Sequence, residues 1–395
     1  MHMDKTKRSI LYILAALVAA AIAVTVMLLV SAPKDTEGEK STVELWYADT
    51  DLMTSRIAEL TRQYNSGQGL DDGVSVRLKA FDSEGELFEA LSGQSGDLPD
   101  MVLCDTNIAA SLFAEGRLAD LSDYTGVGEL IGVSDELLKA SKCDGELAAI
   151  PIGAVTWLLM CDRTLCGGKL PTTFEQLCNE SKAGYAANGE SYFAVKDYAY
   201  FFRNLVAQLG GEFDGLTPHN TDSTECKYVY NSLAEAAYER GLDATAEDPA
   251  QLVAKGKLAC AVASTADIMS AAQDNGCESV IIGAFPVPEG RELRYALKCT
   301  GAAVLSGSDE AVRSSMTFIK WLSSGENISE LTSDTGYIPA RGDMSCSGAV
   351  GKDVVILTER LLKNGENYMP YADATLGGRL SDFDATLTTL MSSLN

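Results

Sequence analysis

The sequence predicts an α/β protein of two lobes, because of its length and of an alternation of strand and helix patterns that runs through most of it. The chain has 395 residues, and the first 40 or so differ in character from the rest. The remainder, about 355 residues, is too long for one compact core and suits two lobes. Apolar residues make up 46% and charged residues 22%, as in ordinary soluble globular proteins.

The alternation of strands and helices begins at residue 42. Residues 74–81 alternate apolar and polar side chains as a strand does, and 52–64 carry apolar residues at helical spacing. Strands are predicted at 42–48, 74–81 and 98–104, and helices at 52–64, 84–92 and 108–115. This order predicts parallel strands with crossover helices on both faces.

The alternation continues to the end of the chain. Strands at 147–152 and 155–161 flank Gly153 and Ala154, and Thr173 is a predicted N-cap for the helix that begins at 174. Further strands are predicted at 257–263, 279–285 and 301–305, and helices at 198–208, 228–240, 310–322, 353–363 and 380–394. We therefore expect one lobe from 42–152 and 283–322, a second from 153–282 and 323–395, and hinge crossings near 151–154, 283–288 and 322–327.

The N-terminal segment predicts a membrane anchor. Residues 10–30 carry no charge, basic residues precede them and acidic residues follow, so one helix can span the bilayer with residues 1–9 in the cytoplasm. Residues 31–41 are polar and predict a linker. A cleaved secretory signal is the alternative, although Pro33 hinders cleavage near Ala32. In both cases the bulk of the chain lies outside the cytoplasm, at the cell membrane.

Charge and cysteine content exclude several classes of site. The formal net charge is −25, which repels phosphate backbones, so we expect no nucleic-acid partner. The ten cysteines stand singly, without a CxxC pair, and His2 and His219 are the only histidines, so no metal site is expected. One or two disulfides are compatible with export, but the sequence does not pair them.

No catalytic motif appears. The sequence contains no GxSxG, HExxH, phosphate-binding loop or GxGxxG that opens a helix after a strand. Paired carboxylates, as in glycosidases, stay open as an alternative because 56 acidic residues make such pairs common by chance. We predict that the protein is not an enzyme and has no cofactor.

Motifs in a fixed order resemble the extracellular solute-binding proteins of ABC sugar importers, the maltodextrin-binding group among them. They are VELWYAD at 43–49, LPDMVLCD at 98–105, FAEGRLADL at 113–121, AIPI at 149–152, LLMCD at 158–162, LPTTFEQL at 170–177, LGGEFDG at 209–215, GKLACAV at 256–262, GAFPVPEG at 283–290, FIKWL at 318–322 and GYIPAR at 336–341. The resemblance implies a periplasmic-binding-protein-like fold, two α/β lobes that close over a ligand, and permease subunits as partners.

Two positions depart from that family's pattern. The chain has Ala263-Ser-Thr-Ala-Asp267 where a "G-x-W" often supplies a stacking tryptophan, and Cys104 where some sugar binders have an aromatic residue. Both changes remove flat apolar faces, which argues against a long oligosaccharide. A monosaccharide, a disaccharide or another small polar solute remains.

The ligand-binding residues are expected at strand ends and in loops that face one crevice. The predicted set is Tyr47, Asp49, Thr50, Asp51, Asp105, Thr106, Asn107, Thr156, Trp157, Tyr198, Tyr200, Ser264, Thr265, Asp267, Tyr337 and Arg341. Carboxylates and amides suit sugar hydroxyls, and a tryptophan supplies a stacking face. Asp49 and Asp51 are alternatively helix N-caps, and Trp157 is alternatively a core residue.

The sequence and the resemblance predict two possible functions. The first is capture of a small polar solute, most plausibly a sugar, for an ABC importer. The alternative is a ligand-sensing ectodomain that is coupled to a membrane signalling partner, which the predicted anchor would make possible.

Overall fold

The computed structural model describes residues 40–93, 98–121, 130–211, 223–275, 277–366 and 372–394. The chain divides into two units, Met1–Ser41 and Thr42–Asn395, and the second contains the architecture that follows. The predicted anchor at 10–30 and almost all of the linker at 31–41 lie outside the described residues. Within the described ranges, no helix is both long and apolar enough to cross a membrane.

Six strands form the larger sheet, in the order β12-β6-β11-β3-β1-β2. Their bounds are β1 Ser41–Ala48, β2 Val74–Phe81, β3 Met101–Asp105, β6 Ile150–Val155, β11 Lys298–Val304 and β12 Ile338–Pro339. β1 and β3 are parallel, as predicted. However, β11 runs antiparallel to both β3 and β6, so the expected all-parallel sheet is wrong and the sheet is mixed.

The second sheet has four strands in the order β10-β7-β9-β8. Their bounds are β7 Trp157–Asp162, β8 Phe193–Val195, β9 Cys260–Ser264 and β10 Val280–Gly283. β7 is antiparallel to both of its neighbours, whereas β8 and β9 are parallel. A separate two-stranded ribbon pairs β4 Lys142–Cys143 with β5 Glu146–Leu147.

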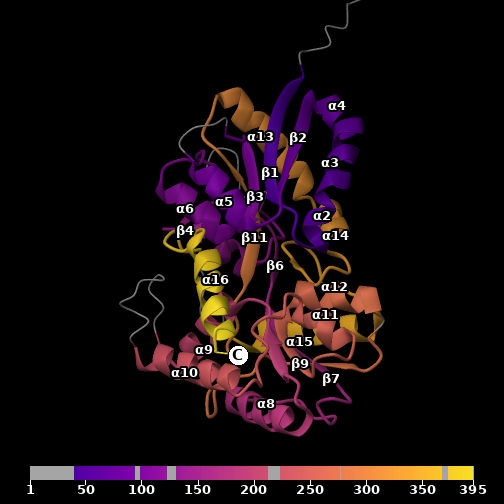
Figure 1. Ribbon diagram of the computed structural model, residues 1–395. Coiled ribbons are helices and arrows are strands. Elements are labelled where there is room, and N and C mark those ends of the chain that lie inside the picture. Colours follow the sequence, from indigo (N-terminus) through magenta and orange to yellow (C-terminus); the bar gives the residue numbers. More distant parts are fainter. Residues whose placement is uncertain are drawn as a thin grey trace, which may run out of the picture. The chain divides into compact units, whose positions relative to one another are not determined.

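Helices pack against both sheets (Figure 1). Their bounds are α2 Leu52–Ser55, α3 Ile57–Ser66, α4 Gln68–Asp72, α5 Glu84–Ser92, α6 Thr106–Ala114, α7 Asp135–Ala140, α8 Phe174–Asn188, α9 Tyr198–Gln208, α10 Thr224–Tyr238, α11 Pro249–Ala254, α12 Thr265–Asn275, α13 Asp309–Leu322, α14 Gly325–Thr332, α15 Gly348–Asn364 and α16 Arg379–Ser392. The predicted cap of α8 is confirmed, since Thr173 accepts a hydrogen bond from the Gln176 amide. Such a bond satisfies an amide that the helix itself cannot pair.

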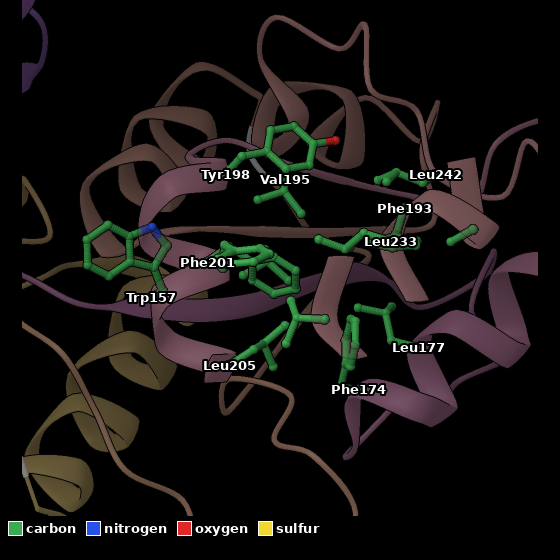
Figure 2. Packing of buried hydrophobic residues seen from close by; sticks show 14 of the residues in the cluster. Trp157, Phe174, Leu177, Phe193, Val195, Tyr198, Phe201, Leu205, Leu233 and Leu242 are labelled. Carbon is green, nitrogen blue, oxygen red and sulfur yellow. The ribbon is translucent and has the colours of Figure 1, made fainter. Parts of the chain in front are cut away.

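Apolar clusters cover both sheets, and one of them joins residues of β6 and β12 to residues of β7 and β9. On the larger sheet, Leu45, Tyr64 and Phe318 are fully buried or nearly so, and they belong to one cluster that includes residues of β1, α3 and α13. Figure 2 shows the core of the second lobe, where Phe174, Phe193 and other residues pack together and Trp157 lies at the margin. The predicted α/β fold is thus present as two separate sheets with helices against them.

The chain crosses between the sheets at places that agree only in part with the predicted hinges, since the second crossing includes most of 283–288. Gly153 and Ala154 lie inside β6, where they pair with β11 and β12, so the first crossing is at Thr156, between β6 and β7. The second passes from β10 to β11 through 284–297. α13 and α14 both contact elements of the larger sheet, so the third crossing follows β12 instead of lying at 322–327. β12 therefore belongs to the larger sheet, although the predicted division placed 323–395 in the second lobe.

Gly336 permits a close backbone approach beside β12. Its φ is +81°, and a Cβ atom there would collide with the carbonyl group of Thr265 at the start of α12. Glycine adopts this left-handed conformation without a steric penalty. The loop before β12 can thus pack directly on a helix that follows a strand of the other sheet.

Candidate functional site

A cavity of about 430 Å³ lies between residues of the two sheets. β1 and β3 are parallel and end at it with Ala48 and Asp105. β11 is antiparallel to β3 and pairs Thr300 with Asp105, so its first residue, Lys298, also lies at this edge. From the second sheet, Trp157 begins β7 and pairs with Ser264 at the end of β9. We call this cavity the cleft.

Asp51 and Tyr337 line the wall formed by the larger sheet. Asp51 caps α2, because its side chain accepts hydrogen bonds from the Met53 and Thr54 amides. Its other carboxylate oxygen accepts a hydrogen bond from the Tyr337 hydroxyl at 2.7 Å. Burial and the neighbouring Asp51 raise the pKa of Tyr337 well above its ordinary value, so the phenol remains a neutral donor.

Asp105 connects the two walls of the cleft. The hydroxyl of Tyr200, on α9, donates to Asp105 Oδ2 at 2.9 Å. The other oxygen, Oδ1, accepts from the backbone and side-chain amides of Asn107 at 2.8 and 2.9 Å. The side-chain oxygen Oδ1 of Asn107 accepts in turn from the Asp373 amide. Asp105 is therefore fixed in position with its acceptor sites directed at both lobes.

Trp157 and Tyr200 form an aromatic pair at the back of the cleft. Their ring centroids are 4.4 Å apart and their planes differ by 16°, the parallel arrangement that aromatic rings adopt when they stack. Trp157 is 2% exposed, and its Nε1 has no hydrogen-bond partner among the described residues. One face of the indole is thus covered by the protein's own tyrosine.

Lys298 and Glu84 form an ion pair in the cleft, with Nζ and Oε2 2.7 Å apart. Burial raises the pKa of Glu84 despite the lysine, and Asp105 and Asp51 add to the rise. For Lys298, burial opposes the charged form, but the negative charges of Glu84, Asp105 and Asp197 outweigh it and raise its pKa. The ammonium group therefore stays charged and partly neutralises a strongly acidic wall.

Three further carboxyl groups face the cleft from the second lobe: Asp197, Asp267 and Asp384. Asp197 caps α9 through the Tyr200 amide, and Asp384, on α16, accepts from the Ala199 amide at 3.0 Å. Burial raises the pKa of Asp197 to about 7, and the nearby Asp384 contributes. Burial also raises the pKa of Asp384 and of Asp267. These groups hold protons more tightly than free carboxyls, because each loses water and they lie among other acids.

The cleft brings together half of the residues that the sequence predicted for it. Those that line it are Thr50, Asp51, Asp105, Trp157, Tyr200, Ser264, Asp267 and Tyr337. Thr50, Asp51, Asp105 and Ser264 lie at or just after strand ends, as the strand-end argument expected, whereas Trp157 begins β7, Tyr200 and Asp267 lie in α9 and α12, and Tyr337 precedes β12. The alternative interpretation of Asp51 as a helix N-cap is also confirmed, so Asp51 both caps α2 and lines the cleft.

The other predicted residues do not line the cleft, and packing explains several of them. Tyr47 and Tyr198 are buried in the cores of the two lobes, Tyr47 in a part of β1 that is buried on both faces and Tyr198 at the start of α9. Thr156 donates to the Ala296 carbonyl. Arg341 donates to the Ile131 carbonyl, on another part of the surface. Four more predicted residues are absent from the lining of the cleft: Asp49, Thr106, Asn107 and Thr265.

Sequence reasoning missed the charged residues that dominate the cleft. The most important are Glu84, Lys196, Asp197, Lys298 and Asp384. Asp197 follows β8 by two residues, so the strand-end rule contained a signal for it. Asp384 lies within a helix near the C-terminus, and no local pattern marks it. In the described ranges, no group of three or more acidic, histidine or cysteine side chains is arranged to hold a metal ion.

The comparison with solved structures shows the fold. The unliganded and acarbose-bound GacH receptor of Streptomyces glaucescens has a TM-score of 0.68 at 16% identity, covering 90% of this chain and 93% of that one. Maltose-bound MalE3 of T. maritima has 0.72 at 15%, with 90% and 95% covered. An ABC transporter solute-binding protein of Agrobacterium radiobacter K84 in complex with ribitol has 0.71 at 18%, with 90% and 93% covered.

Sequence comparison gives the family. No curated protein matches the chain significantly. The model of the bacterial extracellular solute-binding proteins matches residues 59–356, well over half of the chain and both sheets apart from β1. Members of this family bind solutes for ABC transporters and are not enzymes. The chain belongs to the bacterial extracellular solute-binding protein family.

Proposed function

We propose that the protein captures a small sugar or polyol in the cleft and delivers it to the permease subunits of an ABC importer. The observation that carries this proposal is the set of oriented carboxylates in the cleft, such as Asp105, with Trp157 and Tyr200 among the residues that line it. Aromatic faces bind the apolar faces of sugar rings, and carboxylates accept hydrogen bonds from several hydroxyls. The cavity of about 430 Å³ has the size of a small-molecule site.

The similar structures support this class of ligand, because they bind acarbose, maltose and ribitol. The two departures at Cys104 and 263–267 still argue for a short ligand, since Cys104 lines the cleft and offers no aromatic face. A monosaccharide, a disaccharide or a linear polyol therefore fits the proposal better than a long oligosaccharide.

A calorimetric titration with short sugars and polyols tests the proposal, after a thermal-shift screen selects ligands that stabilise the fold. Trp157→Ala should weaken binding of the selected ligand by about 1–3 kcal/mol if the indole contributes to the ligand face. Trp321→Ala is the matched control, because Trp321 packs in the other core beside Phe318 and Tyr64. Unchanged affinity in a folded Trp157→Ala protein would remove this residue from the site.

A cationic solute is the second candidate, and one observation favours it. Six carboxyl groups and only two lysines line the cleft, and these are Asp51, Glu84, Asp105, Asp197, Asp267, Asp384, Lys196 and Lys298. A bound amine would relieve the repulsion among the carboxylates. Polyamines and amino sugars therefore belong in the same screen. Stabilisation by polyamines alone would favour this second candidate over sugars and neutral polyols.

We further propose that residues 10–30 remain attached as the membrane anchor. The support is their uncharged length and the basic residues before them. Mass spectrometry of the membrane-extracted protein should recover the N-terminal peptide intact. A soluble mature chain that starts near Pro33 would contradict the anchor and support a cleaved signal.

A further inference from the structure

Two cysteines of the second lobe lie directly opposite each other on neighbouring strands. Cys161 of β7 is the register partner of Cys260 of β9, and their sulfur atoms are 2.8 Å apart. Both residues are fully buried in the core of the second lobe. All ten cysteines fall within the described residues, and among these this is the pair whose sulfurs meet.

The hydrogen-bond pattern of the strands places this pair in the geometry that a disulfide requires. The Asp162 amide donates to the Ala259 carbonyl, and the Cys260 amide donates away from β7, to Tyr192. Cys161 and Cys260 therefore form a non-hydrogen-bonded pair, in which facing Cα atoms lie about 4.5 Å apart with their side chains close. That spacing falls within the range of about 4.4–6.8 Å found in disulfides.

We infer that Cys161 and Cys260 form a disulfide in the exported protein, whereas the other eight cysteines remain thiols. An extracellular protein folds where disulfides form and persist. Formation occurs by exchange with a disulfide donor, either a dithiol oxidoreductase or a small-molecule disulfide. The donor's S–S bond breaks, the Cys161–Cys260 bond forms, and the donor takes up two electrons and the two thiol protons and leaves as thiols.

The surroundings of the pair determine when the exchange can take place. In the folded lobe, the hydrogen bond with Cys260 and burial raise the pKa of Cys161, so the reactive thiolate is scarce. Cys166 is near enough to interact electrostatically with both members of the pair, but among the described residues the sulfur–sulfur contact is that of Cys161 with Cys260. The bond must therefore form before the second sheet closes over it, and once closed it is shielded from reductants.

The test is a count of thiols in the full-length protein taken from the cell envelope. Samples are quenched in acid, alkylated in denaturant before or after reduction, and mapped by mass spectrometry. We expect eight alkylated cysteines of the ten before reduction and ten after it, with a cross-linked peptide that joins Cys161 to Cys260. Ten alkylated cysteines without reduction, or a protected pair elsewhere, would overturn the inference.

Variants give a second readout that does not depend on ligand binding. Cys161→Ala should show nine alkylated cysteines with or without reduction, because Cys260 loses its partner. Cys277→Ala is the matched control at another buried cysteine and should show seven before reduction and nine after it. A protected pair that persists in Cys161→Ala would refute the assignment. Because thiols are counted in denaturant, the result holds even for a variant that folds poorly, and it is independent of which solute the cleft binds.

Discussion

The hydrogen bond between Tyr200 and Asp105 should favour the closed arrangement of the two lobes before any ligand binds. Tyr200 belongs to α9 of the second lobe, Asp105 ends β3 of the larger sheet, and the two oxygens are 2.9 Å apart. A hydrogen bond to a charged group contributes about 1.5–3 kcal/mol. Tyr200→Phe removes the hydroxyl and keeps the ring on Trp157, so the ratio of closed to open molecules should fall about tenfold or more.

Tyr337→Phe is a matched control for this experiment. The Tyr337 hydroxyl donates an equally short bond, 2.7 Å, to Asp51. Both partners of that bond adjoin the larger sheet, since Tyr337 precedes β12 and Asp51 follows β1. Removing it should cost stability without shifting the balance between open and closed lobes.

Hydrogen exchange of the ligand-free protein, followed by mass spectrometry, measures the difference. Some amides are shielded from solvent only while the two lobes are closed. When the lobes close faster than these amides exchange, their exchange rate is proportional to the fraction of molecules that are open. Peptides that line the cleft, such as those that contain Asp105 or Tyr200, should therefore exchange about tenfold faster in Tyr200→Phe. An increase below about twofold, or an equal increase in Tyr337→Phe, would refute the role of this bond.

Three further changes test other parts of the structure. Lys298→Met should destabilise the fold by about 2 kcal/mol, because it removes the partner that stabilises the charged form of Glu84, whose pKa burial already raises; adding Glu84→Gln should recover part of the loss in denaturant titrations. The pKa of Asp197 is raised to about 7 from an unfolded value of 3.8, so its contribution to stability is complete below about pH 4 and is lost as pH rises through 7. Asp197→Asn keeps a capping oxygen, and denaturation at pH 5 and pH 8 should show a smaller loss of stability with rising pH than in the wild type. Thr173→Ala should lower the unfolding free energy by about 1 kcal/mol, whereas Ser347→Ala should change little, since Ser347 caps α15 without a side-chain hydrogen bond.

Elements with an unambiguous period could be predicted from the sequence alone. The strand at 74–81 and the helices at 84–92 and 198–208 were predicted with the bounds that the structure has. The helix predicted at 228–240 begins earlier, at Thr224, because Ser223 caps it through the Cys226 amide ahead of a polar first turn. Apolar periodicity marks where a helix is buried, and caps mark where it begins.

The cleft was predictable only in part because the sheets are mixed. The strand-end rule looks for side chains after the carboxyl end of each strand, and it placed Asp51 and Asp105 in the cleft. β11 runs the opposite way from β3, so its amino end faces the cleft, and Lys298 precedes the predicted strand. Strand direction depends on pairing between segments that are distant in the chain, and residue patterns within one segment do not contain it.

The pairing of β6 with β11 also has a consequence for how the protein reaches its folded state. The four-stranded sheet is built from residues 157–283, but the core of this lobe also takes Leu380 and Met391 from α16, so the lobe is complete only when the C-terminal helices have joined it. The larger sheet cannot be completed until residues 298–304 have joined β6 and β3, which requires closing a loop that contains the whole four-stranded sheet. Such long-range pairing is entropically costly and slow.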